Sequence, residues 1–314
     1  MKMRKALLVI LHIHSLLSAS SFVITPCNNL ISTNVNNGEL QVSSLCMSTT
    51  TSTATTAVST LINKAESSTK SKAVRQSKGT DARIIFPGGG IFFYWQAGAA
   101  SYLREAGYDL SDVTMSGASA GALAATLTLA DVDFEEATSL ALKLAEDAGV
   151  WDRPLGLQGV WGPMIETWLN DLLPDNAVEM VDERLSLLVT SIPSFRTDRI
   201  SSFESKEDLV RCNMASVHLP WFLDGKLTSN FRQAPRIDGS FRAKTEDYFP
   251  QVKNGQVDDS LIILDWKSDP VMEGKTKDFI KLTSKEGIWD LLEQGRSYAQ
   301  IMDKRGDFDT ISQS

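Results

Sequence analysis

The first candidate for chemistry is a serine between two glycines, in the pentapeptide Gly117-Ala118-Ser119-Ala120-Gly121. This Gly-x-Ser-x-Gly spacing is typical of a nucleophile elbow, in which a sharp turn between a strand and a helix exposes the serine Oγ. The two glycines allow the turn and the close packing, and the positive end of the helix stabilises a developing alkoxide. A serine within a run of small residues gives the same pattern, so the surrounding sequence has to decide.

Three consecutive glycines, Gly88, Gly89 and Gly90, are the second candidate. A glycine loop between a strand and a helix can present backbone N–H groups to an oxyanion. The rival interpretation as a dinucleotide-binding loop lacks the third spaced glycine, because Phe93 stands there, and no Gly-Lys-Ser/Thr phosphate loop follows the cluster. A plain flexible turn is the other alternative.

The third candidate is Asp238, which precedes Gly239 and Ser240 in the sequence PRIDGSF. An Asp-Gly pair by itself most often marks a turn. In the presence of a candidate nucleophile, however, a carboxylate is also a candidate for the base that takes the serine proton.

The histidines distinguish a dyad from a triad. A Ser-His-Asp triad in the α/β-hydrolase order needs a histidine after the acid, and none follows Asp238. Two of the three histidines lie at positions 12 and 14, and the third, His218, stands in the apolar sequence MASVHLPWF. That setting is typical of a packed core histidine, and His218 could be the base only in another order of residues. A pair of Ser119 and Asp238 is therefore the simplest arrangement.

Composition narrows the function classes. The 314 residues are 42% hydrophobic, which suits a soluble globular protein with a sizeable core, and the formal net charge is −8. An acidic chain has no electrostatic reason to bind nucleic acid, although local basic patches for anionic lipid are not excluded. The cysteines, Cys27, Cys46 and Cys212, predict neither a disulfide framework nor a Cys/His cluster that would bind a metal.

The elements that must position the candidate residues alternate between strand and helix from residue 81 onward. Strand character is found at 82–87, 112–116, 184–192 and 260–266, and helix character at 96–107, 120–130, 133–149, 162–174, 205–216 and 285–302. The helix at 133–149 is predicted to have Asp133 as its N-cap and to stop at Gly149. Such alternation predicts an α/β fold with helices on the faces of a sheet, and no Pro/Gly/Ser-rich break divides the single domain at 81–314.

The first 80 residues have a different character. Residues 1–21 have a positive start, an apolar run and small residues at 18–21, which predicts a secretory signal peptide. Residues 22–80 are rich in Ser and Thr and carry only two acids, Glu39 and Glu66, which predicts a disordered transit-like segment or linker. With Phe22 after the expected cleavage site, the segment resembles the bipartite presequences of algae with complex plastids. We expect a plastid destination by the secretory route, with a secreted or endomembrane protein as the alternative.

The order and spacing of GGG, GASAG and DGS resemble the patatin-like phospholipase family. The resemblance covers roughly residues 83–245, and the segments 162–192 and 203–226 are similar to the adiponutrin-type branch. It implies an α/β/α sandwich with a central, mostly parallel sheet. It also implies that Ser119 is the nucleophile and Asp238 the base, and that Gly88, Gly89 and Gly90 line an oxyanion hole.

The sequence departs from the family pattern in two places. The family's glycine loop usually continues through a basic residue and another glycine, where this chain has Ile91, Phe92 and Phe93. The family also prefers Gly or Ala after the Asp-Gly pair, where this chain has Ser240. The first change is expected to enlarge an apolar mouth, and the second replaces one small residue by another.

The function that these features predict is hydrolysis of a carboxylic ester of an acyl lipid through a serine acyl-enzyme, without a cofactor. Phospholipid, galactolipid and triacylglycerol all fit the prediction. The alternatives are a lipid transacylase with the same dyad and a catalytically weak lipid-binding regulator. Two aromatic runs, at 92–95 and 221–222, are either core residues or an interfacial lip for a membrane or lipid-droplet surface.

Overall fold

The structure is a computed structural model that describes residues 82–250 and 260–313. The predicted signal peptide at 1–21 and the transit-like segment at 22–80, with Phe22, Cys27 and Cys46, lie outside the described residues.

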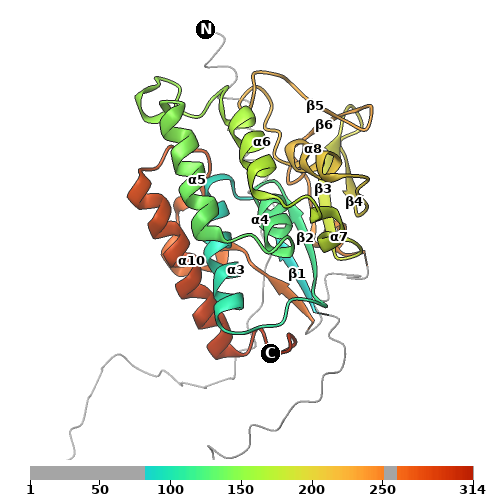
Figure 1. The fold of residues 1–314 in the computed structure, drawn as a ribbon, viewed down its shortest axis with the longest axis vertical. Helices are drawn as coiled ribbons and strands as arrows, with labels where there is room; N and C mark the ends of the chain where they lie inside the picture. The colour runs from blue at the N-terminus through green and yellow to red at the C-terminus, as the bar shows by residue number, and fades with distance from the viewer. Residues whose placement is uncertain (1–81, 251–259, 314) are drawn as a thin grey trace, which may run out of the picture. The chain divides into compact units, whose positions relative to one another are not determined.

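One mixed sheet forms the centre of the described chain (Figure 1). Its strands are β1 (Arg83–Phe86), β2 (Thr114–Ala118), β3 (Leu185–Ser191), β4 (Arg196–Ile200), β5 (Ser229–Phe231), β6 (Ala234–Ile237) and β7 (Leu261–Ile263). Hydrogen bonds join the strands in the series β5-β6-β3-β2-β1-β7, and β4 also pairs with β3. Strands β7, β1, β2 and β3 are mutually parallel, whereas β4 and β6 are antiparallel to β3. The predicted parallel centre of the sheet is therefore confirmed.

Strands β4, β5 and β6 are missing from the sequence-based prediction. β5 and β6 have three and four residues, and β6 contains Pro235. Neither strand is long enough to show the alternation of apolar and polar residues that predicts a strand. β4, with the sequence RTDRI, has little apolar character because its side chains are half-buried or exposed. β4 and β6 pair with β3, and β5 pairs with β6.

The predicted helices are all found, with small shifts at their ends. They are α3 (Phe93–Glu105), α4 (Ala120–Leu129), α5 (Phe134–Asp147), α6 (Trp161–Leu172), α8 (Lys206–Ser216) and α10 (Lys285–Arg305), joined by the short helices α7 (Ala177–Val181) and α9 (Thr245–Tyr248). The Asp133 side chain caps α5 by accepting hydrogen bonds from the N–H groups of Glu135 and Glu136, both at 2.8 Å. Beyond the helix, Gly149 adopts the left-handed conformation expected of a helix stop, with φ +60°.

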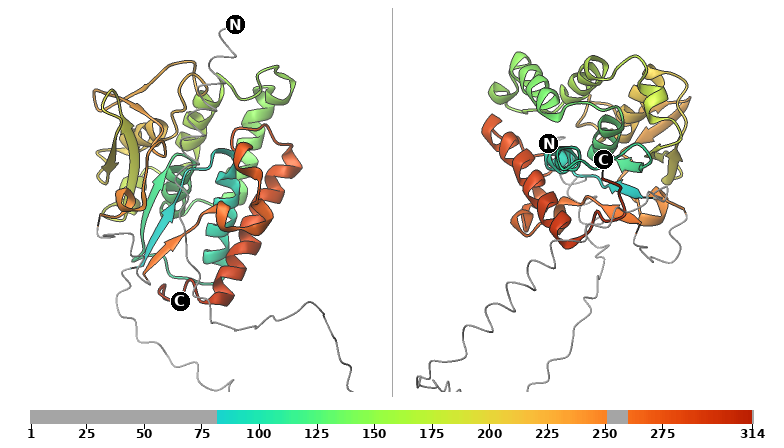
Figure 2. Two further views of the ribbon diagram at one scale, coloured as in Figure 1. Left: turned by 180° about the vertical axis from the view of Figure 1, so that it is seen from behind. Right: turned by 60° about the horizontal axis from the view of Figure 1, so that its bottom comes forward.

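The sheet separates two apolar layers, and alternate residues of β1 show why. Ile84 and Phe86 belong to the main core, together with α3 and α4, whereas Ile85 packs with Tyr248 and Phe249 on the other face. α10 lies alongside α3 in every view (Figures 1 and 2). No helix of the described residues is both long enough and apolar enough to pass through a bilayer.

Candidate active site

The sheet brings Ser119 and Asp238 together because two strands share one edge of β3. The last residue of β2 pairs with Leu188 of β3, and the last residue of β6 pairs with Thr190. β4 pairs with residues 187–191 and so occupies the opposite edge. Since β2 is parallel and β6 antiparallel to β3, the two strands end facing each other. Ser119 and Asp238 each follow the end of one of them.

Ser119 lies on a strained turn between β2 and α4. Its backbone has φ 55° and ψ −128°, a conformation that L-residues with a side chain rarely adopt. The turn is tight: a Cβ on Gly121 would lie 1.9 Å from the carbonyl oxygen of Phe86, and a Cβ on Gly117 would lie 2.2 Å from that of Gly121. The glycines at these two positions are thus required by close backbone approach, as the pentapeptide predicts.

The side chains of Ser119 and Asp238 are joined by a hydrogen bond. Ser119 Oγ donates to Asp238 Oδ2 at 2.6 Å, and the two residues are 7% and 4% exposed. Burial raises the pKa of Asp238 above the ordinary aspartate value, while the hydrogen bonds from Ser119 and Ser240 act in the opposite direction. This arrangement can move a proton from a serine hydroxyl to a carboxylate whose basicity is increased by desolvation.

The remaining bonds of Asp238 hold it in place. Oδ1 accepts from the N–H of Ser240 at 2.8 Å and from Ser240 Oγ at 2.6 Å. The backbone carbonyl accepts from Thr190 Oγ1 at 2.8 Å, and Gly239 N–H donates to the carbonyl oxygen of Ser216 at 2.9 Å. The Asp-Gly-Ser turn is therefore anchored to both β3 and the end of α8.

His218 is not joined to the serine or the carboxylate. Its side chain is 2% exposed, and its Nε2 has no hydrogen-bond partner among the described residues. Burial lowers the pKa of the imidazole, and the nearby Asp224 carboxylate partly opposes this. The contact between His218 and Asp238 is through the backbone, where Asp238 N–H donates to the His218 carbonyl at 2.9 Å. The position agrees with the predicted core histidine.

Ser216 also belongs to the site, although no motif in the sequence indicates it. Its Oγ accepts from the N–H of Ser119 at 2.9 Å and donates to the carbonyl oxygen of Leu188 at 2.7 Å. It lies at the end of α8, 97 residues from Ser119, in a segment with no catalytic motif. No local signal in the sequence could have identified it.

The glycine loop lies next to both reactive residues. In the described chain, the N–H groups of Gly88, Gly89 and Gly90 donate to no other group. Gly88 faces the dyad, since a Cβ on it would lie 2.5 Å from Ser240 Cβ and 3.3 Å from Ser119 Cβ. Gly90, with φ +56°, lines the same cavity as Ser119. Unpaired N–H groups at this position could hold a negatively charged oxygen.

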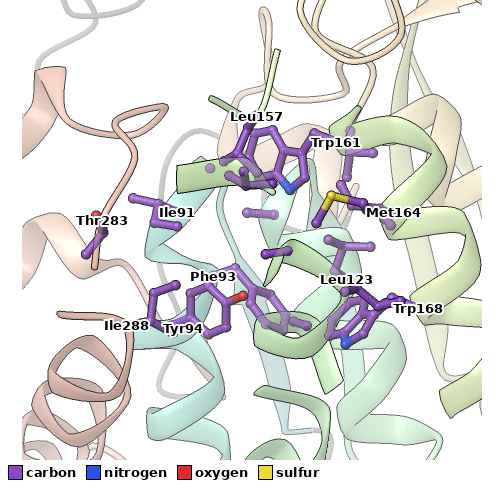
Figure 3. A pocket seen from close by; sticks show the side chains of 18 of the residues that line it. Ile91, Phe93, Tyr94, Leu123, Leu157, Trp161, Met164, Trp168, Thr283 and Ile288 are labelled. Carbon is purple, nitrogen blue, oxygen red and sulfur yellow. The ribbon is translucent and has the colours of Figure 1, made fainter. Parts of the chain in front are cut away.

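Ser119 lines an apolar cavity. Figure 3 shows side chains of the cavity wall. The empty volume of the cavity is about 920 Å³, with the open mouth included. The walls come from the start of α3, the first turn of α4, from α5 and α6, and from the segments at 217–223 and 282–288. The side chains around it include Phe93, Tyr94, Leu123, Trp161, Met164 and Trp168, which are drawn in Figure 3. Such walls favour a long apolar ligand.

The aromatic runs at 92–95 and 221–222 differ in burial. In the first, Phe92 and Trp95 are buried in the core at 2% and 0% exposure, and Phe93 and Tyr94 line the cavity. In the second, Phe222 is buried but Trp221 is 42% exposed. The first run is therefore core and cavity wall rather than a lip, and Trp221 of the second run is exposed, as a lip residue must be.

Comparison with known proteins places the chain in a family. A family model described as Patatin-like phospholipase matches residues 84–246, just over half of the chain. Omega-hydroxyceramide transacylase of Mus musculus is 28% identical over 165 residues, which are 52% of this chain and 27% of that protein. Patatin-like phospholipase domain-containing protein 2 of Bos taurus is 30% identical over 167 residues, 52% of this chain and 34% of that protein.

A third relative is matched over more of its own length. Patatin-like phospholipase domain-containing protein 4 of Homo sapiens is 29% identical over 160 residues, 50% of this chain and 63% of that protein. The matched region is less than two thirds of each of these three relatives. The family match, the mixed sheet flanked by helices and the position of the Gly-x-Ser-x-Gly turn lead to one conclusion: the chain belongs to the patatin-like phospholipase family.

Proposed function

We propose that this protein is a lipid acyl hydrolase that cleaves carboxylic esters with Ser119 as nucleophile and Asp238 as general base. The observation that carries the proposal is the 2.6 Å hydrogen bond between Ser119 Oγ and Asp238 Oδ2, beside an apolar cavity that Ser119 lines. An activated serine beside a cavity for an alkyl chain is the combination that acyl transfer from a lipid requires.

The reaction would proceed in two steps. Asp238 takes the proton of Ser119 as Oγ attacks the ester carbonyl, and the free N–H groups of the glycine loop hold the resulting oxyanion. Asp238 then gives the proton to the departing alcohol, which leaves an ester of Ser119. In the second step Asp238 takes a proton from water as the water attacks this ester, and it returns the proton to Ser119 Oγ as the fatty acid leaves. All of these transfers use groups of the chain and water.

Chemical labelling tests the nucleophile. The full chain is expected to react with a fluorophosphonate at Ser119 and to hydrolyse members of a panel of phospholipid, galactolipid and triacylglycerol, whereas Ser119→Ala is expected to do neither. The matched control is Ser116→Ala, which removes another buried hydroxyl from the same strand-to-helix region. Labelling at another serine, or hydrolysis that survives in Ser119→Ala, would refute the assignment.

The cavity is proposed to hold the acyl chain of the substrate. Ala141 lies on α5 and lines the cavity, so Ala141→Trp would fill part of it with an indole ring. We expect the kcat/KM for long-chain esters to fall much more than that for butyryl esters, because a short chain does not reach the obstruction. An equal loss for both esters would argue against an acyl site there.

A lipid alcohol in place of water would make the enzyme a transacylase with the same dyad. The name of the relative from Mus musculus gives this alternative its support. Product analysis with and without an added lipid alcohol separates the two activities, because transfer consumes the alcohol and forms a new ester. A protein that binds lipid but forms neither product would be a lipid-binding regulator.

The loops around the cavity mouth are proposed to meet the lipid surface. Leu155, Trp221 and Leu227 are 46%, 42% and 51% exposed, and a 2.8 Å hydrogen bond from Gly159 N–H to the Phe222 carbonyl joins the two loops that carry them. Apolar side chains on loop tips can insert into an interface without spanning it. Leu227→Ala should weaken binding to phosphatidylcholine vesicles, whereas Ile301→Ala, at 50% exposure on α10, should not.

A further inference from the structure

Each carboxylate oxygen of Asp238 accepts a hydrogen bond from a serine hydroxyl. Ser119 Oγ donates to Oδ2 at 2.6 Å, and Ser240 Oγ donates to Oδ1 at the same distance. The backbone N–H of Ser240 donates to Oδ1 as well, at 2.8 Å. Oδ2 of Asp238 thus accepts a hydrogen bond from Ser119, whereas Oδ1 accepts two hydrogen bonds from Ser240.

We propose that Ser240 is a positioning residue for the base, whose hydroxyl fixes Oδ1 of Asp238 so that Oδ2 faces Ser119. The inference rests on the proposed function, since it assigns Asp238 the task of taking the serine proton. It assigns to Ser240 a role that the spacing of the motif does not require, because its backbone N–H alone would close the Asp-Gly-Ser turn.

The Ser240 hydroxyl also affects the pKa of Asp238. No cation of the described residues is paired with Asp238, so its negative charge is balanced by hydrogen bonds alone. The titratable neighbour is the buried Tyr248 phenol, whose pKa is raised by burial and by the charges of Asp265 and Asp238. A donor on Oδ1 favours the ionised carboxylate, and the hydrogen bonds of Ser240 lower the pKa that burial raises.

The contact with the glycine loop supports the same role. A Cβ on Gly88 would lie 2.5 Å from Ser240 Cβ and 2.6 Å from Ser240 Oγ, so the loop and the serine are in close contact. The hydroxyl is therefore held between the carboxylate and the loop, and it has little freedom to rotate away from Oδ1. Ser240 is only partly buried, yet its side chain is ordered by these two neighbours.

The test is the titration of Asp238 in full chains that carry Ser240→Ala, Ser240→Gly or the control Ser116→Ala. Ser116 Oγ is also buried and donates to the Ser186 carbonyl, but it makes no contact with Asp238. Two readouts are used: the pH dependence of the rate of fluorophosphonate inactivation, and a ¹³C NMR titration of the aspartate carboxyl carbons. Circular dichroism establishes that each variant is folded.

Both Ser240 variants are expected to move the acid limb of the inactivation rate and the Asp238 titration upward by about 1 pH unit, because a hydrogen bond to a charged group is lost. Ser116→Ala should leave both in place. A folded Ser240→Ala or Ser240→Gly with an unshifted titration, or an equal shift in Ser116→Ala, would overturn the proposal. If the wild-type chain neither reacts with fluorophosphonate nor hydrolyses esters, the proposed function fails, and the NMR titration still decides the role of Ser240.

Discussion

The backbone N–H of Ser119 is bound by the side chain of Ser216, with 2.9 Å between nitrogen and Oγ. The same hydroxyl donates to the carbonyl oxygen of Leu188 on β3. Ser216 thus ties the strained turn that carries Ser119 to the central sheet. Because the Ser119 N–H is occupied by this bond, it is not free to stabilise an oxyanion, and the glycine loop is better placed for that task.

Replacing Ser216 by alanine should loosen the turn. The substitution leaves the buried N–H of Ser119 and the buried carbonyl of Leu188 without this partner, which costs about 1–3 kcal/mol for an unsatisfied polar group. We expect a lower melting temperature and a lower kcat with little change in KM. Ser116→Ala is the control, since it removes a buried hydroxyl that does not contact Ser119. An unchanged kcat in a folded Ser216→Ala protein would contradict this role.

The dyad and a hidden triad make different predictions for two asparagine substitutions. Asp238→Asn should reduce the rate by about 10²-fold or more, because an amide cannot accept the serine proton. His218→Asn should have a far smaller effect in protein that circular dichroism shows to be folded, since the imidazole is not bonded to Ser119 or Asp238. Steady-state kinetics on a soluble ester compares them. A folded His218→Asn as inactive as Ser119→Ala would make His218 the base.

The same Asp238→Asn substitution should stabilise the fold at neutral pH. Burial raises the pKa of Asp238 above its unfolded value, so its favourable contribution is present at low pH and is lost as pH rises through the folded pKa. At pH 7 the ionised carboxylate therefore destabilises the folded state relative to a neutral amide of the same shape. The gain in melting temperature should shrink as pH falls toward the ordinary aspartate value of about 3.9.

Thermal unfolding between pH 7.5 and 4.5 measures this difference. Asp112→Asn, on an exposed side chain, is the control and should show no such trend. A melting temperature for Asp238→Asn below that of the wild type at pH 7 would contradict the expectation that the ionised Asp238 lowers the stability of the fold.

Two glycines set the distance between α3 and α10. A Cβ on Gly98 would lie 1.8 Å from the carbonyl oxygen of Leu292, and a Cβ on Gly295 would lie 1.8 Å from that of Trp95. Because both neighbours are backbone atoms, either alanine substitution must push the helices apart, at a cost of about 1–3 kcal/mol. A Cβ on Gly287, also in α10, would meet the side chains of Thr283 and Ser284, at 2.5 Å from the Thr283 methyl group, and no distant backbone, so Gly287→Ala should be neutral or stabilising. Chemical denaturation of the three variants tests the contrast.

The N-terminal 80 residues predict a destination that can be tested by a fluorescent fusion. We expect residues 1–80 to direct the fluorescent protein to a complex plastid, and Phe22→Ala to divert it along the secretory route. Arrival of both fusions in the secretory route would favour a secreted or endomembrane protein instead. Fluorescence of the unchanged fusion in the cytosol would refute both the signal peptide and the transit-like segment.

Local sequence determined the longer helices, the parallel strands and one half of the candidate site. Helices of ten or more residues show their apolar faces in the sequence, and caps such as Asp133 act within one turn, so their positions could be predicted. The turn at Ser119 could be predicted for the same reason, because strand, glycines and helix are consecutive. The Asp-Gly pair by itself marks a turn, and Asp238 could be proposed as the base because no histidine follows it and because the order of motifs resembles a known family.

The tertiary structure decided which residues meet. Ser119 and Asp238 are 119 residues apart, and they meet because β2 and β6 end on one edge of β3, a pairing that no local pattern encodes. Ser216 lies 97 residues from Ser119, and the cavity walls come from segments spread between Gly90 and Ile288. Periodicity and capping report interactions within a few residues, whereas strand order and packing depend on contacts between distant segments, which the fold alone brings together.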